Sequence, residues 1–176
     1  LTFDAGYDNG NTAKILDTLQ AEQVPAAFFL VGSYVRTYPD LVRRMASEGH
    51  IVGNHTEEHG DMRNIEDAQG FAAALAPVEQ AHKEATGQEM PKFYRPPEGK
   101  FDEQNLKDAR QLGYTTVFWS LAYRDWVEKD QPTAEYAFGK LCPRMHNGAV
   151  VLLHSTSSTN AQILGQLIQR WKQEGY

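Results

Sequence analysis

Cysteine is almost absent from this chain of 176 residues, in which Cys142 is the only one. A single cysteine excludes an internal disulfide. It lies in the segment Lys-Leu-Cys-Pro-Arg, away from any base-like neighbour, so we interpret it as an inert residue rather than a nucleophile.

Positive charge and long apolar runs are also scarce. The chain has 17 Lys and Arg against 23 Asp and Glu, a formal net charge of -6. A nucleic-acid surface needs a basic face, so no nucleic-acid partner is predicted. No apolar run approaches the length of a membrane span, and no signal peptide is present. The chain starts without Met inside an apparent strand, so we expect upstream residues to be missing.

The remaining composition is ordinary for a packed protein. Hydrophobic residues make up 41% of the chain, and aromatic residues make up 11% of it. The length favours a single domain spanning residues 1–176, and no repeat or low-complexity segment interrupts it.

Runs typical of buried strands alternate with amphipathic runs typical of helices. The predicted strands are 1–3, 26–31, 51–52, 92–94, 115–119 and 149–153. Helices are predicted around the apolar faces within 15–19 (with Asn11 or Thr12 as cap) and 41–46, over 65–86, around the face within 106–112, over 134–145 and around the stripe within 163–171. Pro77 is expected to kink or divide the third of these helices. The alternation favours a parallel sheet or barrel with helices outside it.

Ionisable residues follow several of the predicted strands. They are Asp4, the pair His55 and His59, Arg95, Asp125 and His154. Each has a purely structural alternative, such as a cap, an ion pair or a hydrogen-bonded end of a core strand. In parallel α/β folds, however, reactive residues gather where strands end, so the coincidence favours one functional site.

The pair His55 and His59 is the central feature of that site. If the backbone turns helically there, the two side chains share a face and can hold one divalent ion. A metal can polarise a carbonyl and activate water, a carboxylate can take a proton, and a histidine can protonate a departing amine. Arg95 supplies a permanent charge that would keep Asp4 ionised and oriented. These are the parts of a metal-assisted amide hydrolase.

Other chemistries lack their motifs in this chain. Neither G-x-x-x-x-G-K-[ST] nor G-x-G-x-x-G occurs, so no phosphate-binding loop is predicted. No G-x-S-x-G elbow supports a serine nucleophile, and the zincin pattern H-E-x-x-H is also missing.

Five ordered segments resemble the motifs of the polysaccharide deacetylases, the NodB-homology group or carbohydrate esterase family 4. They are Thr2-Phe-Asp-Ala-Gly6, His55-Thr-x-x-His59, Arg95-Pro-Pro-x-Gly99, Asp125-Trp126 and Leu152-Leu-His154. The resemblance covers almost the whole chain as one catalytic domain. It implies a distorted (β/α) barrel of about seven parallel strands with outer helices, which agrees with the alternation above.

The resemblance also implies catalytic roles. Asp4 would be the base, oriented by Arg95, and His154 would be the general acid. His55 and His59 would bind a divalent metal ion, zinc first, with manganese, cobalt or magnesium as alternatives.

Further residues of the motifs would bind substrate or tune the acid. The backbone N–H of Glu98 would help to hold the tetrahedral oxyanion, with Gly99 beside it in the substrate site. Asp125 would sit behind Arg95 or tune the acid. Trp126 would wall the groove, and Leu152 would line the pocket for the acetyl methyl group.

Ala5 is a departure from the family pattern, because most members carry a second aspartate there as a third metal ligand. Asp8, in the same loop, is a candidate substitute. The chain resembles the branch of muramic δ-lactam de-N-acetylases from spore-forming bacteria, which share residues 3–7, 95–101 and 117–120. Those enzymes remove acetyl from N-acetylmuramic acid in peptide-stripped peptidoglycan. The resemblance implies a glycan strand as partner and an exported, cell-envelope or spore-envelope location.

Two alternatives remain open at this point. Within the same class, the chain would deacetylate N-acetylglucosamine polymers or acetylated xylan. From another class, it would be a catalytically silent glycan-binding domain whose metal site was lost through Ala5.

Overall fold

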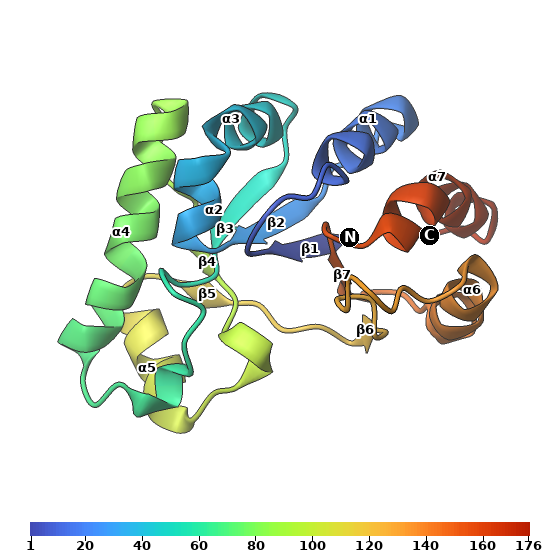
Figure 1. Cartoon of the computed structure of the whole chain (residues 1–176). Helices are drawn as coiled ribbons and strands as arrows, with labels where there is room; N and C mark the ends of the chain where they lie inside the picture. Colours follow the sequence, from blue (N-terminus) through green and yellow to red (C-terminus); the bar gives the residue numbers. More distant parts are fainter. The chain divides into compact units, whose positions relative to one another are not determined.

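The computed structural model describes residues 1–176, and the chain divides into two compact units (Figure 1). The first unit comprises Leu1–Asp4, Asp8–Ala26 and Trp119–Tyr176, and the second comprises Ala5–Tyr7 and Ala27–Phe118. Each unit has strands covered by helices. That residues 1–176 form a single domain stays a prediction.

The first unit contains three strands in the hydrogen-bonded order β1-β7-β6, and both pairings are parallel. The strands are β1 (Thr2–Ala5), β6 (Leu121–Ala122) and β7 (Val151–His154); the helices are α1 (Thr12–Glu22), α6 (Ala134–Leu141), the 3-10 turn η3 (Cys142–Arg144) and α7 (Ser158–Gln173). Helix α7 buries the predicted apolar stripe, and it packs against α1 and α6. In the β1–β7 register Asp4 lies opposite His154, so the two residues end neighbouring strands.

The second unit contains four strands in the order β2-β3-β4-β5, all paired in parallel. The strands are β2 (Ala27–Leu30), β3 (Ile51–Asn54), β4 (Phe93–Tyr94) and β5 (Thr115–Thr116); the helices are α2 (Gly32–Thr37), α3 (Pro39–Ser47), α4 (Ala68–Thr86) and α5 (Glu103–Gln111), with 3-10 turns η1 (Met62–Asn64) and η2 (Pro97–Gly99). Helix α4 packs against α2, α3 and α5.

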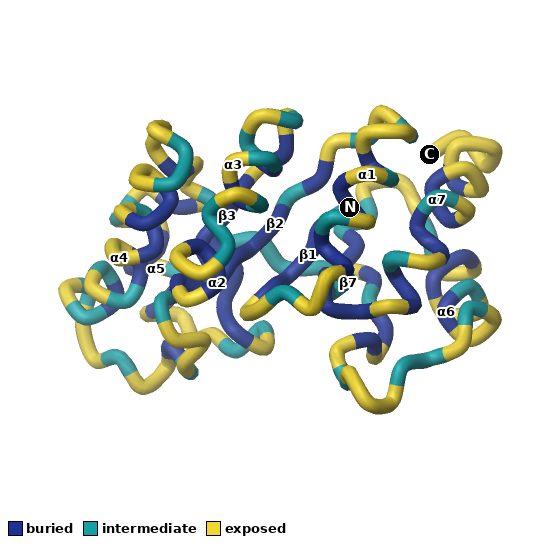
Figure 2. Tube along the Cα trace, turned by 45° about the horizontal axis from the view of Figure 1, so that its top comes forward, coloured by how far each residue is buried: buried dark blue, intermediate teal, exposed yellow.

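Most residues of β1, β2, β3 and β7 are buried, the short strands β4, β5 and β6 are only partly buried, and the outer faces of the helices are exposed (Figure 2). Strand β2 is typical, since Phe28, Phe29 and Leu30 are all buried although successive side chains point to opposite faces. This is the pattern of a parallel strand covered on both sides.

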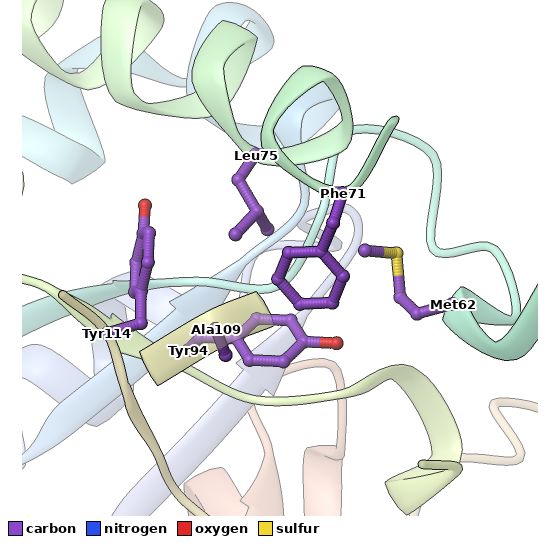
Figure 3. Packing of buried hydrophobic residues seen from close by; sticks show 6 residues of the cluster. All are labelled: Met62, Phe71, Leu75, Tyr94, Ala109 and Tyr114. Atoms are coloured by element: carbon purple, nitrogen blue, oxygen red, sulfur yellow. The ribbon is translucent and has the colours of Figure 1, made fainter. Parts of the chain in front are cut away.

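One core cluster of the second unit joins α4 to the strands below it (Figure 3). Phe71 and Leu75 of α4 pack toward Tyr94 of β4, and the rings of Phe71 and Tyr94 meet edge to face at 5.4 Å. The cluster is completed by Met62, Ala109 and Tyr114. Burying each large apolar side chain stabilises the fold by about 1.5–3 kcal/mol, so this cluster fixes α4 over β4.

Seven strands, parallel pairings and intervening outer helices confirm the predicted α/β class, that of a distorted (β/α) barrel. No helix is both long enough and apolar enough to cross a membrane.

The sequence pattern did not predict α2 or β6, and three of the predicted elements differ from the structure. The strand predicted over 115–119 ends at Thr116, because the carbonyls of Val117 and Phe118 accept hydrogen bonds from the Arg95 guanidinium instead of from a neighbouring strand. The helix predicted over 65–86 begins at Ala68 and is not divided at Pro77. Pro77 is exposed, so the carbonyl that loses its N–H partner there can bond to water.

The helix predicted over 134–145 is shorter than expected. Helix α6 ends at Leu141, and Cys142–Arg144 forms a 3-10 turn. Pro143 lacks the N–H that would continue the α-helical bonding, which accounts for the change.

Candidate active site

His154 ends β7 with its ring held by Asp125. The Nδ1 of His154 lies 2.7 Å from Oδ1 of Asp125, and its backbone N–H donates to Oδ2 at 2.8 Å. Asp125 is fully buried, whereas the His154 side chain keeps 24% of its surface exposed. The pair therefore has a buried carboxylate behind a partly exposed imidazole. Of the two roles predicted for Asp125, this contact fits the tuning of the acid.

Trp126 lies beside this imidazole. Its ring centroid is 5.7 Å from that of His154, the planes are tilted by 59°, and 53% of its surface is exposed. A large exposed aromatic next to an accessible histidine is suited to contact a sugar ring. Leu152, two residues before His154 on β7, is buried.

Asp4 is a buried carboxylate at the end of β1, with 6% of its surface exposed. Its Cα is the register partner of His154, and its carbonyl accepts the N–H of Ser155 at 3.4 Å. The sequence predicted that Asp4 and His154 end two different strands, and the structure shows that these strands are neighbours paired in parallel.

His55 and His59 approach each other, but not through the helical turn predicted for residues 55–59. Thr56 and His59 have positive φ values of 69° and 56°, so the segment is a strained loop after β3 rather than a helix. The ring centroids nevertheless lie 4.8 Å apart with an interplanar angle of 71°. The two imidazoles therefore lie side by side without the helical turn that the sequence interpretation considered, and their binding of a metal ion stays a prediction.

The imidazole of His55 has a defined tautomer. Its Nδ1 lies 2.7 Å from the carbonyl oxygen of Arg95, which can only accept, so Nδ1 carries the proton and Nε2 carries the lone pair. A backbone carbonyl behind the ligating histidine is the usual way in which a metal-binding tautomer is set.

Backbone contacts from three sides fix the loop that carries these histidines. The N–H of His55 donates to Leu30 O of β2, the N–H of Gly32 donates to Thr56 O, and the N–H of Glu57 donates to Ala74 O of α4. The side chain of Asn54 bonds to Leu75 O at 3.0 Å and accepts from the Thr56 N–H at 2.9 Å. These bonds offset the cost of the positive φ values.

Arg95 is fully buried at the end of β4. Its Nε donates to Val117 O at 3.1 Å and its Nη2 to Phe118 O at 3.4 Å, while the guanidinium lies 4.2 Å from the centre of the Phe29 ring. A guanidinium is too costly to bury without such partners, so these contacts hold a permanent positive charge in a fixed orientation.

Glu98 and Gly99 follow in the turn η2, with φ values of 54° and 68°. The amides of Gly99 and Lys100 donate to Pro96 O and Pro97 O, each at 3.0 Å, inside the turn. The Glu98 side chain points to solvent and pairs with Lys100 at 2.8 Å. That lysine is the main cause of a lowered pKa at Glu98, and His59 adds to it. The Glu98 side chain thus has no part in the role predicted for this residue, which is the donation of its backbone N–H to the oxyanion.

The donor set for a metal ion consists of two imidazoles and no third side chain. No group of three or more His, Cys, Asp or Glu residues is arranged to hold a metal. Ala5 occupies the position of the usual family aspartate, and both carboxylate oxygens of Asp8 accept local N–H groups, of Gly10 at 3.1 Å and Thr12 at 3.2 Å. Asp8 thus acts as a cap of α1. The two imidazoles fit a zinc-type ion that completes its coordination with water or substrate.

Residues outside the motifs also belong to the site, and the sequence pattern did not single them out. Asn160 bonds to Asp125, and Tyr123 bonds to Asn160 in turn. Asn54 and Glu57 fix the histidine loop. The sequence signal that could have revealed Asn160 is its polar side chain at a buried position of the amphipathic helix α7.

Comparison with known proteins identifies the family. Residues 1–117 match the family model "Polysaccharide deacetylase". The chain belongs to this family. It is 41% identical over its full length to the peptidoglycan-N-acetylmuramic acid deacetylase PdaA of Bacillus subtilis, and it spans 66% of that relative's length. The structure of the same relative, described as a family 4 carbohydrate esterase, aligns with a TM-score of 0.95 at 40% identity, covering 99% of this chain and 74% of the other.

Two further relatives mark the alternatives within the family. A peptidoglycan-N-acetylglucosamine deacetylase of Bacillus cereus is 35% identical over 99% of this chain and 63% of its own length. A structure described as a CE4 family pseudoenzyme from Bacillus anthracis aligns with a TM-score of 0.89 at 26% identity, covering 99% of this chain and 60% of that one. These comparisons show that the chain belongs to a family whose members include deacetylases named for either sugar of peptidoglycan and a structure described as a pseudoenzyme.

Proposed function

We propose that this chain hydrolyses the N-acetyl amide of N-acetylmuramic acid in peptide-stripped peptidoglycan and releases acetate, with muramic δ-lactam formation in the spore cortex as its context. The observation that carries the proposal is the acid–base pair on neighbouring strands: Asp4 opposite His154, with His154 bonded to a buried Asp125. The 41% identity to a relative named for N-acetylmuramic acid supports the choice of sugar.

In the proposed reaction, the oxygen of a water molecule bonds to the acetyl carbon while Asp4 takes a proton from that water. The resulting tetrahedral oxyanion accepts a hydrogen bond from the Glu98 N–H. His154, protonated on both ring nitrogens, then gives the Nε2 proton to the amide nitrogen. The C–N bond breaks, and the products are acetate and the free amine of the sugar.

His55 and His59 would hold the divalent ion that the family implies, and the lone pair on His55 Nε2 suits that role. When bound, the ion would polarise the carbonyl and lower the pKa of a coordinated water. Arg95, buried and fixed in orientation, would keep Asp4 ionised as a base. Gly99 and Leu152 would shape the site around the acetyl group.

The proposed preference for peptide-free strands follows from the exposed indole of Trp126 next to His154. The lactyl ether of muramic acid carries either a peptide or a free carboxylate. A bulky peptide would collide with a groove that Trp126 walls. An exported, cell-envelope or spore-envelope location follows from this substrate.

The second candidate is deacetylation of N-acetylglucosamine residues, favoured by the 35% identity to a relative named for that sugar. Acetylated xylan belongs to the same alternative. A silent glycan-binding domain is the third, because the family includes a structure described as a pseudoenzyme and Ala5 removes one metal ligand. Asp4 and His154 are both retained, which favours activity.

Acetate release from amidase-treated glycan strands, with and without a chelator, tests the proposal. We expect acetate loss mainly from muramic residues by mass spectrometry, and little on intact peptidoglycan or chitin oligomers. Asp4→Asn and His154→Ala should each lower kcat by roughly 10²–10⁴-fold with the fold intact. Loss mainly from glucosamine residues would select the second candidate. No release by the metal-loaded protein from any of these glycans would select the silent domain.

A further inference from the structure

Asn160 occupies a position where helices usually hold a capping side chain. It is the third residue of α7, and its backbone N–H donates to Oγ of the N-cap Ser157 at 3.1 Å. In a capping box the side chain at this position returns to the N-cap backbone N–H. Here the Asn160 side chain turns instead toward the Asp125–His154 pair. A local rule broken at a buried position points to a function outside the helix.

Two donors of the Asn160 amide reach the catalytic pair. Its Nδ2 donates to Asp125 Oδ2 at 2.6 Å and to the carbonyl of His154 at 3.1 Å. Its Oδ1 accepts the hydroxyl of Tyr123 at 2.5 Å. Asn160 and Asp125 are almost completely buried, so water does not compete for these bonds.

The acceptors around Asn160 fix which way its amide points. The carboxylate of Asp125 and the carbonyl of His154 can only accept, so the NH₂ group must face them. The Asn160 oxygen then faces Tyr123, whose hydroxyl keeps its proton because burial, with a contribution from the charge of Asp125, raises the pKa of Tyr123, and so donates to it. A flipped amide would place its oxygen against that carboxylate and lose both bonds.

Asp125 is thereby bonded on both oxygens by donors of fixed direction. Oδ2 accepts from Asn160 and from the His154 N–H, which leaves Oδ1 directed at His154 Nδ1. With Nδ1 protonated, Nε2 is the nitrogen that accepts and delivers a proton. Asp4 is the register partner of His154 on β1, and Tyr123 lies close enough to Asp125 for the carboxylate charge to help raise the pKa of the tyrosine.

We propose that Asn160, oriented by Tyr123, is a positioning residue for the general acid, acting through Asp125 to hold His154 with Nε2 directed to the leaving amine. This inference rests on the proposed function for its catalytic consequence. The hydrogen-bonded chain Tyr123–Asn160–Asp125–His154 exists in the fold independently of the sugar attacked.

Gln131 provides a matched control within the same loop. Its Nε2 donates to the backbone carbonyls of Asp125 and Val127, each at 2.9 Å, and its Oε1 accepts from Ser157 Oγ at 2.7 Å. Gln131 therefore ties the same loop to the start of α7 without touching the carboxylate. A variant at this position therefore measures how much stability and activity are lost when the loop is loosened but the carboxylate keeps its hydrogen bonds.

The kinetic test compares Asn160→Ala and Tyr123→Phe with Gln131→Ala in the full chain, on the amidase-treated glycan. We expect Asn160→Ala to lower kcat by about 10–100-fold and Tyr123→Phe by about 3–10-fold, with KM changed less than about twofold. Gln131→Ala should lower Tm while changing kcat less than about threefold. If all three variants lose kcat in proportion to their loss of Tm, Asn160 is merely structural and the inference is overturned.

A second measurement does not need turnover. The ring signals of His154, titrated by NMR, should show Nδ1 protonated in the neutral form of the wild-type protein. Asn160→Ala leaves Asp125 a stronger acceptor and Asn160→Asp adds a negative charge, so each should raise the pKa of His154 by about 0.5–1 unit. Gln131→Ala should leave that midpoint in place. An unmoved midpoint in both Asn160 variants overturns the inference.

The two measurements separate the inference from the proposed function. If the wild-type protein releases no acetate, the proposed function fails, and the His154 titration still decides whether Asn160 positions the pair. If the wild-type protein is active and the Asn160 variants match it in kcat, the inference alone fails.

Discussion

The carboxylate of Asp125 accepts two hydrogen bonds from His154, one from ring Nδ1 at 2.7 Å and one from the backbone N–H at 2.8 Å. The carboxylate thus fixes both the plane of the imidazole and the strand end that carries it. Because Asp125 is fully buried, this orientation does not depend on solvent. The outer nitrogen of His154 is the one placed for proton transfer.

Asp125→Asn should abolish most activity without unfolding the protein. An amide in this position either turns its NH₂ group toward His154 Nδ1, which selects the wrong tautomer, or loses the charge that stabilises the imidazolium. We expect kcat to fall by roughly 10²–10⁴-fold. Steady-state kinetics on the glycan, with circular dichroism as the check on folding, measures this. A variant with near-wild-type kcat would show that His154 does not act as the acid.

Ala5→Asp should tighten the binding of a divalent ion, because it restores an anionic ligand beside two neutral imidazoles. His55→Ala should abolish binding. Calorimetric titration of zinc and manganese into the native protein and both variants measures the affinities without reference to activity. Asp8→Asn is the control, since that carboxylate is engaged by Gly10 and Thr12 and its loss should leave the affinity unchanged.

Two results would contradict the metal-site prediction. The first is native protein that binds no ion at millimolar concentration while still releasing acetate, since catalysis would then rest on Asp4, Arg95 and His154. The second is Asp8→Asn that weakens binding as strongly as His55→Ala, which would make Asp8 the substitute ligand.

Gly32→Ala should destabilise the loop that carries the histidines. A Cβ at this position would overlap Oε2 of Glu57 and come within 2.6 Å of its Cδ, so the carboxylate would have to leave its ion pair with Arg36. We expect a loss of at most about 1 kcal/mol in the free energy of unfolding, by denaturant titration, because the displaced carboxylate ends a flexible side chain and its ion pair is partly exposed. The metal affinity of the native site should fall with it.

Gly139→Ala is the matched control for that substitution. Gly139 lies inside α6, and a Cβ there meets no atom within 4 Å. Alanine should therefore stabilise the protein by about 0.5–1 kcal/mol, because glycine loses more backbone entropy on folding. If Gly32→Ala lowers the free energy of unfolding while Gly139→Ala raises it, the loss at Gly32 is due to the displaced Glu57. A Gly32→Ala variant as stable as the wild-type protein would show that Glu57 has an alternative position.

Acid should destabilise the fold partly through His82. Burial lowers the pKa of this histidine, although its bond to the carbonyl of Gln88 opposes the shift. When the folded-state pKa lies below the unfolded value of about 6.5, the unfolded chain binds the proton first, so stability is lost as the pH falls through that value. His82→Asn keeps a donor for Gln88 and should make the fall in Tm between about pH 7.5 and 5.5 smaller.

The exposed His146 is the control for the acid experiment, and His146→Asn should leave the fall in Tm unchanged. His50, whose pKa is also lowered by burial, adds to the same effect, so a residual fall is expected in the His82 variant. A His82 variant with an undiminished fall in Tm would assign the acid sensitivity to other groups.

Much of the site was predictable because strand ends are visible in a sequence. The carboxyl ends of β1 and β7 are marked by apolar runs that stop at Asp4 and His154, and parallel pairing then makes the two residues neighbours. The α/β class followed from the same alternation, since strands covered on both faces are continuously apolar. The two imidazoles, four positions apart, were also recognisable as a pair.

Tertiary contacts decided what periodicity could not. The strand predicted over 115–119 stops at Thr116 because a buried guanidinium, distant in sequence, takes the carbonyls of Val117 and Phe118. The histidines meet in a loop with positive φ values instead of in a helix, because bonds from Leu30, Gly32 and Ala74 hold that backbone in place.

By itself, the sequence determined the alternation of most strands and helices and the residue types at the strand ends, because both follow from local polarity along the chain; the short elements α2 and β6 were not recognisable in it. The tertiary structure alone decided that Asp125 bonds to His154. It also decided that Asn160, which follows Asp125 by 35 residues, orients the carboxylate of Asp125. The packing of the helices determines which buried donors and acceptors lie within hydrogen-bonding distance of each other. Burial then makes each of these bonds obligatory, since no water can replace it.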